Sequence, residues 1–262
     1  MYIFKNELKR YLPAAFITGT ILGLFMLMVI SLYPVFSEDA ENMATMFGDL
    51  SAFTDIVNID LANMSTLEGF YGMEHDVLVN LSLSVFAAMI GGNMLSKEEK
   101  EHTSEFLLTH PVSRQRIIIE KILATAVIII TAVSCIYIIG YMGIYGTGQE
   151  VDHTLFYNIH LVSFLLYLNI SLLALGIIEL LPFKSSFIGT FVVVILYALL
   201  VVSNLSEDWE VVRWFTPFHY SSTALLIENE ALPWKYIAVN YGYTVVILFL
   251  GLLRYTKRDI NS

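Results

Sequence analysis

The chain has 262 residues, of which 56% are hydrophobic and only 15% are charged, and a water-soluble domain of this length could not bury so much apolar surface. Its formal net charge of −10 would suit an acidic soluble protein, but the charges are segregated between long apolar runs, and no basic surface for nucleic acid is evident. The single cysteine, Cys135, lies within an apolar run and excludes a disulfide framework, so the composition predicts an all-α integral membrane protein.

The N-terminal segment, residues 1–11, is short and amphipathic. Its apolar side chains, such as Phe4, can face lipid, while Lys5 and Lys9 can reach anionic headgroups. We therefore predict an interfacial helix that enters the first spanning helix at Pro13, because proline is well tolerated in the first turn of a helix.

Uncharged apolar runs divide the rest of the chain and predict one transmembrane domain over residues 1–262, with six spanning helices. A span needs about 20 residues to cross a hydrocarbon core about 30 Å thick, and each run is close to that length or longer. The predicted spans are residues 12–36, 77–96, 122–145, 153–178, 185–204 and 236–253. Because the turn around Lys184 is very short, the fourth and fifth spans should form a hairpin.

The basic residues determine the predicted orientation of the spans. Twelve of the 14 Lys and Arg residues lie near the two termini, in the 97–121 segment or at Lys184, whereas most acidic residues lie in the alternate loops. Cytoplasmic loops are enriched in Lys and Arg. The prediction is therefore a multi-pass cell-membrane protein with both termini in the cytoplasm and an acidic outer loop, 38–76, that carries short helices.

A second outer segment, residues 205–234, precedes the sixth span. It is too charged to cross a membrane, but its aromatic side chains suit the membrane–water interface. The aromatic residues of interest are Trp209, Trp214, Phe218 and Tyr220. We predict one or two short re-entrant or interfacial helices here, dipping against the outer leaflet.

The densest run of charge connects the second and third spans, between Lys97 and Lys121. Its first part carries both signs and then Phe106, Leu107 and Leu108, before Pro111 ends the pattern. One interpretation is a short amphipathic helix on the membrane surface, followed by a corner that redirects the chain. The other is a solvated loop helix with no partner, and the residue pattern leaves both open.

Several catalytic and transport patterns are missing from the sequence. No Gly-rich loop is followed by Lys-Ser or Lys-Thr, so the chain itself is not expected to hydrolyse ATP. The six histidines show no His-Glu-x-x-His spacing, and we predict no metal site. The predicted spans carry no ionisable residues at mid-depth, which argues against a proton-coupled transporter. Energy for transport would have to come from another subunit.

The connector resembles that of a known family, the membrane subunits of ATP-binding-cassette type-2 exporters, which have the type V exporter fold. In that family the connector is acid-rich and then reads Gly-Thr-x-Glu-x-Leu-Leu, Pro-Val/Ile-Ser-Arg and a Lys a few residues on. The matching residues here are Glu98, Glu99, Glu101, Thr103, Glu105, Leu107, Leu108, Pro111, Val112, Ser113, Arg114 and Lys121. The one departure is His102, which stands where the family usually has Gly.

Three further likenesses extend the resemblance over the full chain. The amphipathic N-terminal segment resembles the family's elbow helix. The run Thr216-Pro217-Phe218-His219-Tyr220 resembles a Ser-Pro-Phe-x-Tyr motif before the last span, and Lys257-Arg258-Asp259 resembles an Arg-Arg-Asp tail.

The resemblance implies that residues 97–116 contain a coupling helix, which docks in a cleft of a cytoplasmic ATPase. The residues implied in this contact are Glu98, Glu101, His102, Glu105, Phe106, Leu108 and Arg114. It also implies two permease chains, identical or paralogous, over two ATP-binding subunits. ATP and Mg²⁺ would bind those subunits, and this chain would be non-catalytic and need no cofactor.

By the same resemblance, the transport pathway would lie between the two permeases and be lined mainly by the first, second and fifth spans. The aromatic residues Trp209, Trp214, Phe218 and Tyr220 would form an extracellular gate over it.

The cargo is a separate question. The uncharged spans and the abundance of Phe and Tyr (17 and 15) favour an amphipathic or hydrophobic cargo, such as a peptide or an antibiotic-like molecule. Alternatives within the family are export of a cation, which the acidic outer loop could attract, or of a lipid or polysaccharide. A different class is a non-transporting receptor or immunity scaffold that sequesters a toxic peptide. Dependence on nucleotide distinguishes a transporter from a scaffold.

Overall fold

The computed structural model describes residues 2–38, 66–100, 113–149, 151–182, 185–205, 207–229 and 231–257. These residues form helices and the short connections between them, and none of them forms a strand. Six helices among them are long and apolar enough to cross a membrane, which confirms the six predicted spans. The chain is therefore a multi-pass membrane protein.

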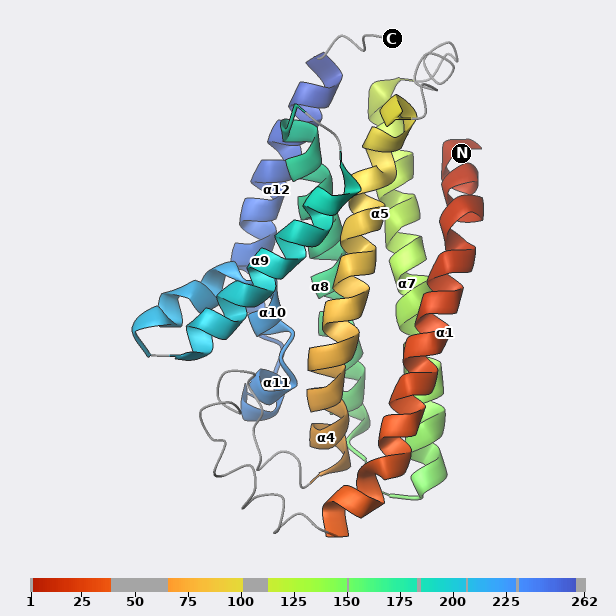
Figure 1. The fold of residues 1–262 in the computed structure, drawn as a ribbon, viewed down its shortest axis with the longest axis vertical. Helices are drawn as coiled ribbons and strands as arrows, with labels where there is room; N and C mark the ends of the chain where they lie inside the picture. The colour runs from red at the N-terminus through yellow and green to blue at the C-terminus, as the bar shows by residue number, and fades with distance from the viewer. Residues whose placement is uncertain are drawn as a thin grey trace.

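The long helices make up an elongated bundle, with shorter helices on one flank (Figure 1). The long helices are α1 (Tyr2–Glu38), α5 (Asn80–Lys100), α7 (Arg114–Thr147), α8 (His153–Leu180), α9 (Ser186–Leu205) and α12 (Trp234–Lys257). The shorter elements are α4 (Leu67–Glu74), the π-helical segment η2 (His75–Val79), the 3₁₀ helix η3 (Glu207–Phe215), α10 (Pro217–Tyr220) and α11 (Thr223–Asn229).

The start of α1, the end of α5, the start of α7 and the end of α12 all lie at the same end of the bundle (Figure 1). We call this the basic end, because Lys5, Lys97, Arg114, Lys121 and Arg254 occur on these four helix termini. Lys100, the last residue of α5, and Ser113, the N-cap of α7, both belong to the predicted connector and are therefore both at the basic end.

The second spanning helix begins earlier than its predicted start at residue 77. The elements α4, η2 and α5 follow one another without a break, and we call residues 67–100 the α4–α5 rod. Thr66 caps its N-terminus, since the Thr66 hydroxyl oxygen accepts a hydrogen bond from the Gly69 amide at 3.1 Å. Asp76 is the last acidic residue before the predicted start of the second span. Its side chain is hydrogen-bonded inside the protein, so the helix can include Asp76 and begin earlier in the sequence.

The structure also corrects the prediction of a separate N-terminal elbow helix. Residues 2–11 are the first turns of α1, which continues through Pro13 as one helix of 37 residues. At about 1.5 Å per residue it is roughly 55 Å long, well beyond a hydrocarbon core of about 30 Å, so its first turns extend past the core. Contacts of Glu7 with α5 and α7 hold these turns along the bundle rather than flat on a membrane surface.

Small residues allow the helices to approach closely. Gly19 and Gly23 of α1 are four residues apart and face α7, where a Cβ atom on Gly19 would come within 2.5 Å of the Ala132 carbonyl oxygen. Gly91 of α5 likewise meets the backbone of α8 at Ser171. Helix α8 also packs on α12, and α5 also packs on α9, so α5 and α8 form the centre of the bundle.

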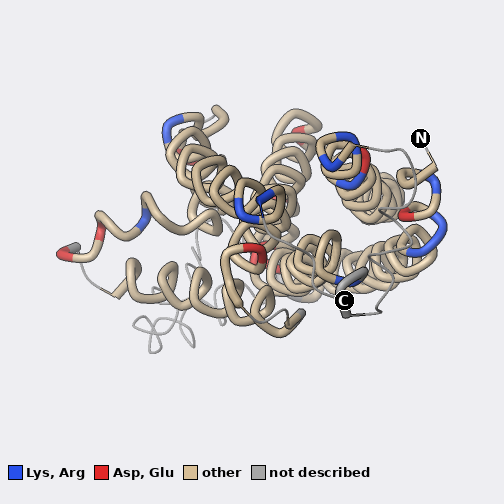
Figure 2. The backbone as a smooth tube through the Cα atoms, turned by 90° about the horizontal axis from the view of Figure 1, so that it is seen from above, with Lys and Arg blue, Asp and Glu red and all other residues tan. Residues whose placement is uncertain are grey.

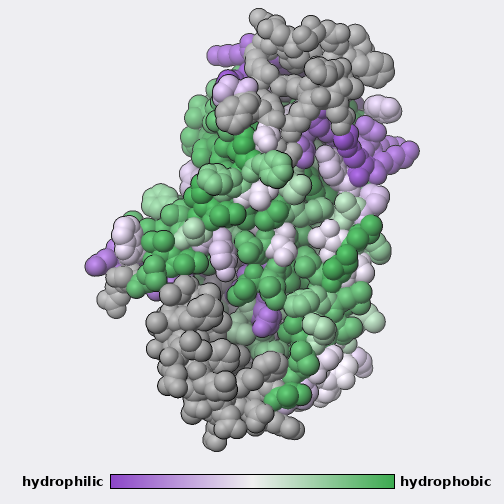
Figure 3. Space-filling view, viewed as in Figure 1, coloured by the Kyte–Doolittle hydropathy of each residue, from purple (hydrophilic) through white to green (hydrophobic). Residues whose placement is uncertain are grey.

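The outer faces of the long helices carry apolar side chains, as expected for contact with lipid. Exposed examples are Phe16, Ile21 and Leu24 on α1 and Phe187 and Phe191 on α9. Hydrophobic residues cover the middle of the face seen in Figure 3, and hydrophilic residues gather toward the basic end. Viewed along the bundle, charged residues appear as short stretches on an otherwise uncharged backbone (Figure 2).

Candidate functional site

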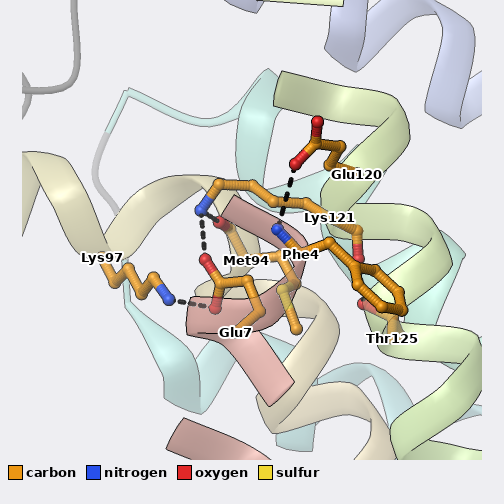
Figure 4. A network of polar contacts seen from close by, with 7 residues as sticks. All are labelled: Phe4, Glu7, Met94, Lys97, Glu120, Lys121 and Thr125. Carbon is orange, nitrogen blue, oxygen red and sulfur yellow. Dashed lines mark hydrogen bonds and ion pairs between the residues drawn. The ribbon is translucent and has the colours of Figure 1, made fainter. Parts of the chain in front are cut away.

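One carboxylate at the basic end binds a lysine from each of two other helices (Figure 4). Glu7, in the second turn of α1, accepts hydrogen bonds from Lys97 Nζ at its Oε2 and from Lys121 Nζ at its Oε1, the latter at 2.8 Å. The Glu7 and Lys121 side chains are 2% and 1% exposed, so both ion pairs lie out of water. Three helices are thus joined at one buried carboxylate.

A second set of contacts strengthens the same junction. Lys121 Nζ also donates to the Met94 carbonyl oxygen of α5 (Figure 4). The neighbouring Glu120 accepts from the Phe4 backbone amide at 3.1 Å and from Arg116 Nε at 3.0 Å. The Phe4 amide is among the first N–H groups of α1, which have no acceptor within their own helix, so Glu120 satisfies a donor that α1 leaves open.

We call Glu7, Lys97, Glu120 and Lys121 the junction. Lys97 and Lys121 are the two residues that bound the predicted connector, and both bind Glu7. Removing one partner of a buried ion pair costs about 3–5 kcal/mol, because a charge is then left without compensation in a low-dielectric site. A force applied to the connector would therefore reach α1, α5 and α7 together.

Arg114, a predicted ATPase contact, lies against the C-terminus of α12. Its Nη1 donates to the carbonyl oxygens of Tyr255 at 2.9 Å and Thr256 at 3.0 Å. A guanidinium at a helix C-terminus satisfies carbonyl groups that have no intrahelical partner and complements the helix dipole. Ser113 caps the start of α7, where its Oγ accepts from the Arg116 amide at 3.3 Å. Arg114 therefore links the exit of the connector to the last helix.

The remaining predicted coupling residues lie at or beyond the end of α5. Glu98 is in the last turn of α5. Glu101, His102, Glu105, Phe106 and Leu108 fall outside the described residues. Their contact with an ATPase stays a prediction.

Three of the four predicted gate residues pack against the spanning helices, whereas Trp209 is 53% exposed. Trp214 packs against Tyr236 of α12 with the rings tilted and their centroids 4.4 Å apart. Phe218 contacts Tyr197 of α9 edge-to-face at 5.3 Å, and Tyr220 is fully buried. These contacts attach η3 and α10 to α9 and α12. Trp209 is not brought together with the other three.

A buried polar cluster that the sequence analysis did not identify joins the α4–α5 rod to α8. Tyr71 and His160 are hydrogen-bonded at 3.1 Å between Oη and Nε2, and His160 Nδ1 is 2.9 Å from the Phe156 carbonyl oxygen. A carbonyl oxygen can only accept, so Nδ1 carries the proton and Nε2 accepts from the Tyr71 hydroxyl. Further along, the Tyr167 hydroxyl donates to Asn80 Oδ1 at 2.7 Å.

The sequence analysis missed this cluster because its members come from distant segments. His75 faces His160 edge-on with ring centroids 5.1 Å apart, and it lies in the stretch that was assigned to the outer loop. His75 and His160 are thus buried ionisable side chains in two helices that are long and apolar enough to cross a membrane. Tyr71 and His75 are four residues apart, which places them on one face of a helix, and this spacing is a local sequence signal that could have pointed to the cluster.

The chain was compared with known proteins. A family model described as "ABC-2 family transporter protein" matches residues 1–260. A comparison with curated proteins and one with solved structures each gave no match.

Proposed function

Since the chain belongs to the ABC-2 transporter family and is a non-catalytic membrane permease component of such a transporter, we propose that it is the permease half of an ATP-driven exporter. A separate ATPase subunit would supply the energy by docking on the connector, residues 97–116. Transport would run outward, the ATPase would bind the connector, and the cargo would be amphipathic or hydrophobic.

The junction is the observation that supports this proposal most. Lys97 lies in the last turn of α5, which ends at Lys100, and Lys121 lies in the second turn of α7, and both lysines bind Glu7 of α1. A connector helix that is docked on an ATPase can drive a membrane domain only if the movement of that helix displaces the spanning helices together. The two buried ion pairs supply that connection between the connector and three spans.

The docking surface would combine charge with an apolar anchor. Glu98, Glu101, Glu105 and Arg114 supply charges of both signs, and Phe106 with Leu108 would fill an apolar pocket, since interface energy concentrates in a few large buried side chains. Arg114 already caps α12, so its role would be to hold the exit of the connector in place beneath the ATPase.

The assembly would contain two permease chains over two ATP-binding subunits, with ATP and Mg²⁺ bound only in the latter. The permease partner would be a second copy or a paralogue. The basic end would face the cytoplasm, since Lys and Arg concentrate on the inner side of membrane proteins. The aromatic helices η3 and α10 would close the outer side of the pathway.

We infer an amphipathic or hydrophobic cargo, such as a peptide or an antibiotic-like molecule. Support comes from the apolar character of the helix surfaces, where side chains such as Phe187 and Phe191 of α9 are 84% and 65% exposed. An apolar cargo could bind to these surfaces through hydrophobic contacts.

Nucleotide dependence tests this function. Cells that express the chain with its ATPase would be loaded with a fluorescent amphipathic peptide, and efflux would be compared with cells in which the Walker-motif lysine of the ATPase is replaced. The proposal predicts efflux that is lost with the disabled ATPase. Efflux of monovalent cations but not of the peptide would overturn the cargo assignment, and peptide protection that persists without ATP hydrolysis would overturn the exporter.

A further inference from the structure

The α4–α5 rod makes a second polar contact far from the junction, through Asp76. Asp76 Oδ2 accepts a hydrogen bond from the Thr223 backbone amide at 2.6 Å, and its Oδ1 accepts from the Thr223 hydroxyl at 3.2 Å. Asn80 Nδ2, one turn along the rod, donates to the same Oδ1 at 3.2 Å. Thr223 is the first residue of α11, so Asp76 binds the outer helices from the spanning rod.

The contact is directional and closely fitted. The first amides of a helix have no intrahelical acceptor, and the Asp76 side chain supplies one to the Thr223 amide. Gly72 lies one turn before Asp76, and any Cβ atom there would overlap the Thr223 side chain. Thr223 itself is 2% exposed. Gly72 therefore leaves room for the Thr223 side chain beside the rod, and Asp76 accepts its hydrogen bonds.

The local backbone supports a special role for this position. Asp76 lies in η2, the π-helical segment between α4 and α5. Such segments are rare, and they occur frequently at functional sites because the wider turn redirects side chains. Here the π-helical turn places His75 toward the buried cluster with His160 and Asp76 toward Thr223.

A cavity of about 30 Å³ lies beside Asp76, between the rod and the outer helices, and it is large enough to hold a water molecule. Its lining includes Asp76 and Asn80 of the rod, Tyr197 and Leu200 of α9, and Phe218 and Ser222 from the outer helices. Leu226 of α11 packs in a buried apolar cluster with Ile159 and Val162 of α8, whereas the Asp76 hydrogen bonds join α11 to the rod.

The rod thus has a polar attachment near each end. Lys97 binds Glu7 at the basic end, and Asp76 binds Thr223 about 30 Å away along the helix axis. We propose that Asp76 is a positioning residue that fastens α11, and with it α10, to the rod, so that a movement of α5 at the junction is transmitted to the outer helices. The transmission rests on the proposed function, but the attachment itself does not.

The attachment is tested in the purified permease by hydrogen exchange of the amides in 223–229, which needs no ATPase and no cargo. Asp76→Ala should accelerate their exchange about tenfold, since the acceptor of the Thr223 amide and hydroxyl is lost. Thr223→Ser keeps both donors and should retain the slow exchange, and Glu228→Gln, an exposed carboxylate on the same helix, is the matched control. Unchanged exchange in Asp76→Ala would overturn the proposal.

Transmission along the rod is tested by a double-mutant cycle in the same assay. Glu7→Gln, at the opposite end, should alter the exchange of 223–229 in the native background and should have no such effect when Asp76 is already alanine. Additive effects would overturn the positioning role and leave Asp76 with a local structural one. If no ATPase supports transport, the proposed function fails, whereas this cycle still decides the role of Asp76.

Discussion

Glu7 and Lys121 are 114 positions apart in the chain, yet they form a buried ion pair with 2.8 Å between Oε1 and Nζ. The same carboxylate binds Lys97, so the start of α1 is fixed to both helices that flank the connector (Figure 4). Because these ion pairs join α1, α5 and α7, a displacement of the connector would move the three helices together.

Loss of the Glu7 carboxylate should destabilise the protein strongly. In Glu7→Gln the two lysines remain buried without their anion, at a cost of about 3–5 kcal/mol. The unfolding temperature in detergent should fall by several degrees, whereas the exposed carboxylate variant Glu228→Gln should unfold as the native protein does. Equal unfolding temperatures for the two variants would contradict the junction.

The close contact of α1 and α7 should tolerate no added side chain at Gly19. Gly19→Val places Cβ against the Ala132 carbonyl and forces the helices apart, with an expected loss of about 1–3 kcal/mol. Gly242→Ala on α12 is the control, because nothing lies within 4 Å of the added atom and alanine favours a helix. Thermal unfolding of the two variants in detergent checks the difference, and similar losses in both would exclude close helix contact as the cause.

Removing the Arg114 side chain should loosen the end of α12. Arg114→Ala leaves the carbonyl groups of Tyr255 and Thr256 without this donor, which is worth about 1 kcal/mol or more. Hydrogen exchange and limited proteolysis of 250–257 should both increase, and Arg116→Ala, which changes a neighbouring arginine, should leave that segment protected. Protection that is unaffected in Arg114→Ala would show that Arg114 does not cap α12.

The pH dependence of stability should report on His219 of α10. Burial, and then the nearby charge of Arg213, lowers the pKa of His219 from an ordinary 6.5 to about 4. Since the folded state binds the proton more weakly than the unfolded state, stability is complete above about pH 6.5 and declines as the pH falls toward 4. The loss at about pH 5 is about 2 kcal/mol.

His219→Gln should make the decline smaller by about 2 kcal/mol at about pH 5, and the exposed His153→Gln should leave it unchanged. Unfolding temperatures at about pH 7.5 and about pH 5 measure the effect. An identical pH profile for native protein and His219→Gln would contradict a buried neutral imidazole at Tyr236, whose ring lies 4.7 Å from that of His219.

The number of spans could be predicted because length and absence of charge alone decide whether a helix crosses a bilayer. The start of the second helix could not be predicted, since two of the three hydrogen bonds that satisfy Asp76 within the protein come from Thr223, which lies 147 residues further on. The N-terminal helix was mispredicted for the same reason. Its amphipathic pattern suits a membrane surface, but Glu7 finds its partners on α5 and α7.

The candidate site was only partly predictable. Charge density singled out the connector between Lys97 and Lys121, but no local pattern shows that both lysines bind one carboxylate from α1. His160 lies seven positions after His153 on the same helix, whereas its hydrogen-bond partner is Tyr71, 89 positions away. Pairings at such separations depend on how helices pack, and a single sequence does not determine that.

The central claim is that an ATPase docks on the connector, and co-purification tests it most directly. The tagged chain would be isolated from native membranes in detergent, alongside a variant with Glu105→Ala and Phe106→Ala and an outer-side control, Glu210→Ala. We predict that a Walker-motif ATPase accompanies the native chain and the control in stoichiometric amount and is lost from the connector variant. A well-folded native preparation without any ATPase, or an ATPase retained equally by all three, would contradict the account.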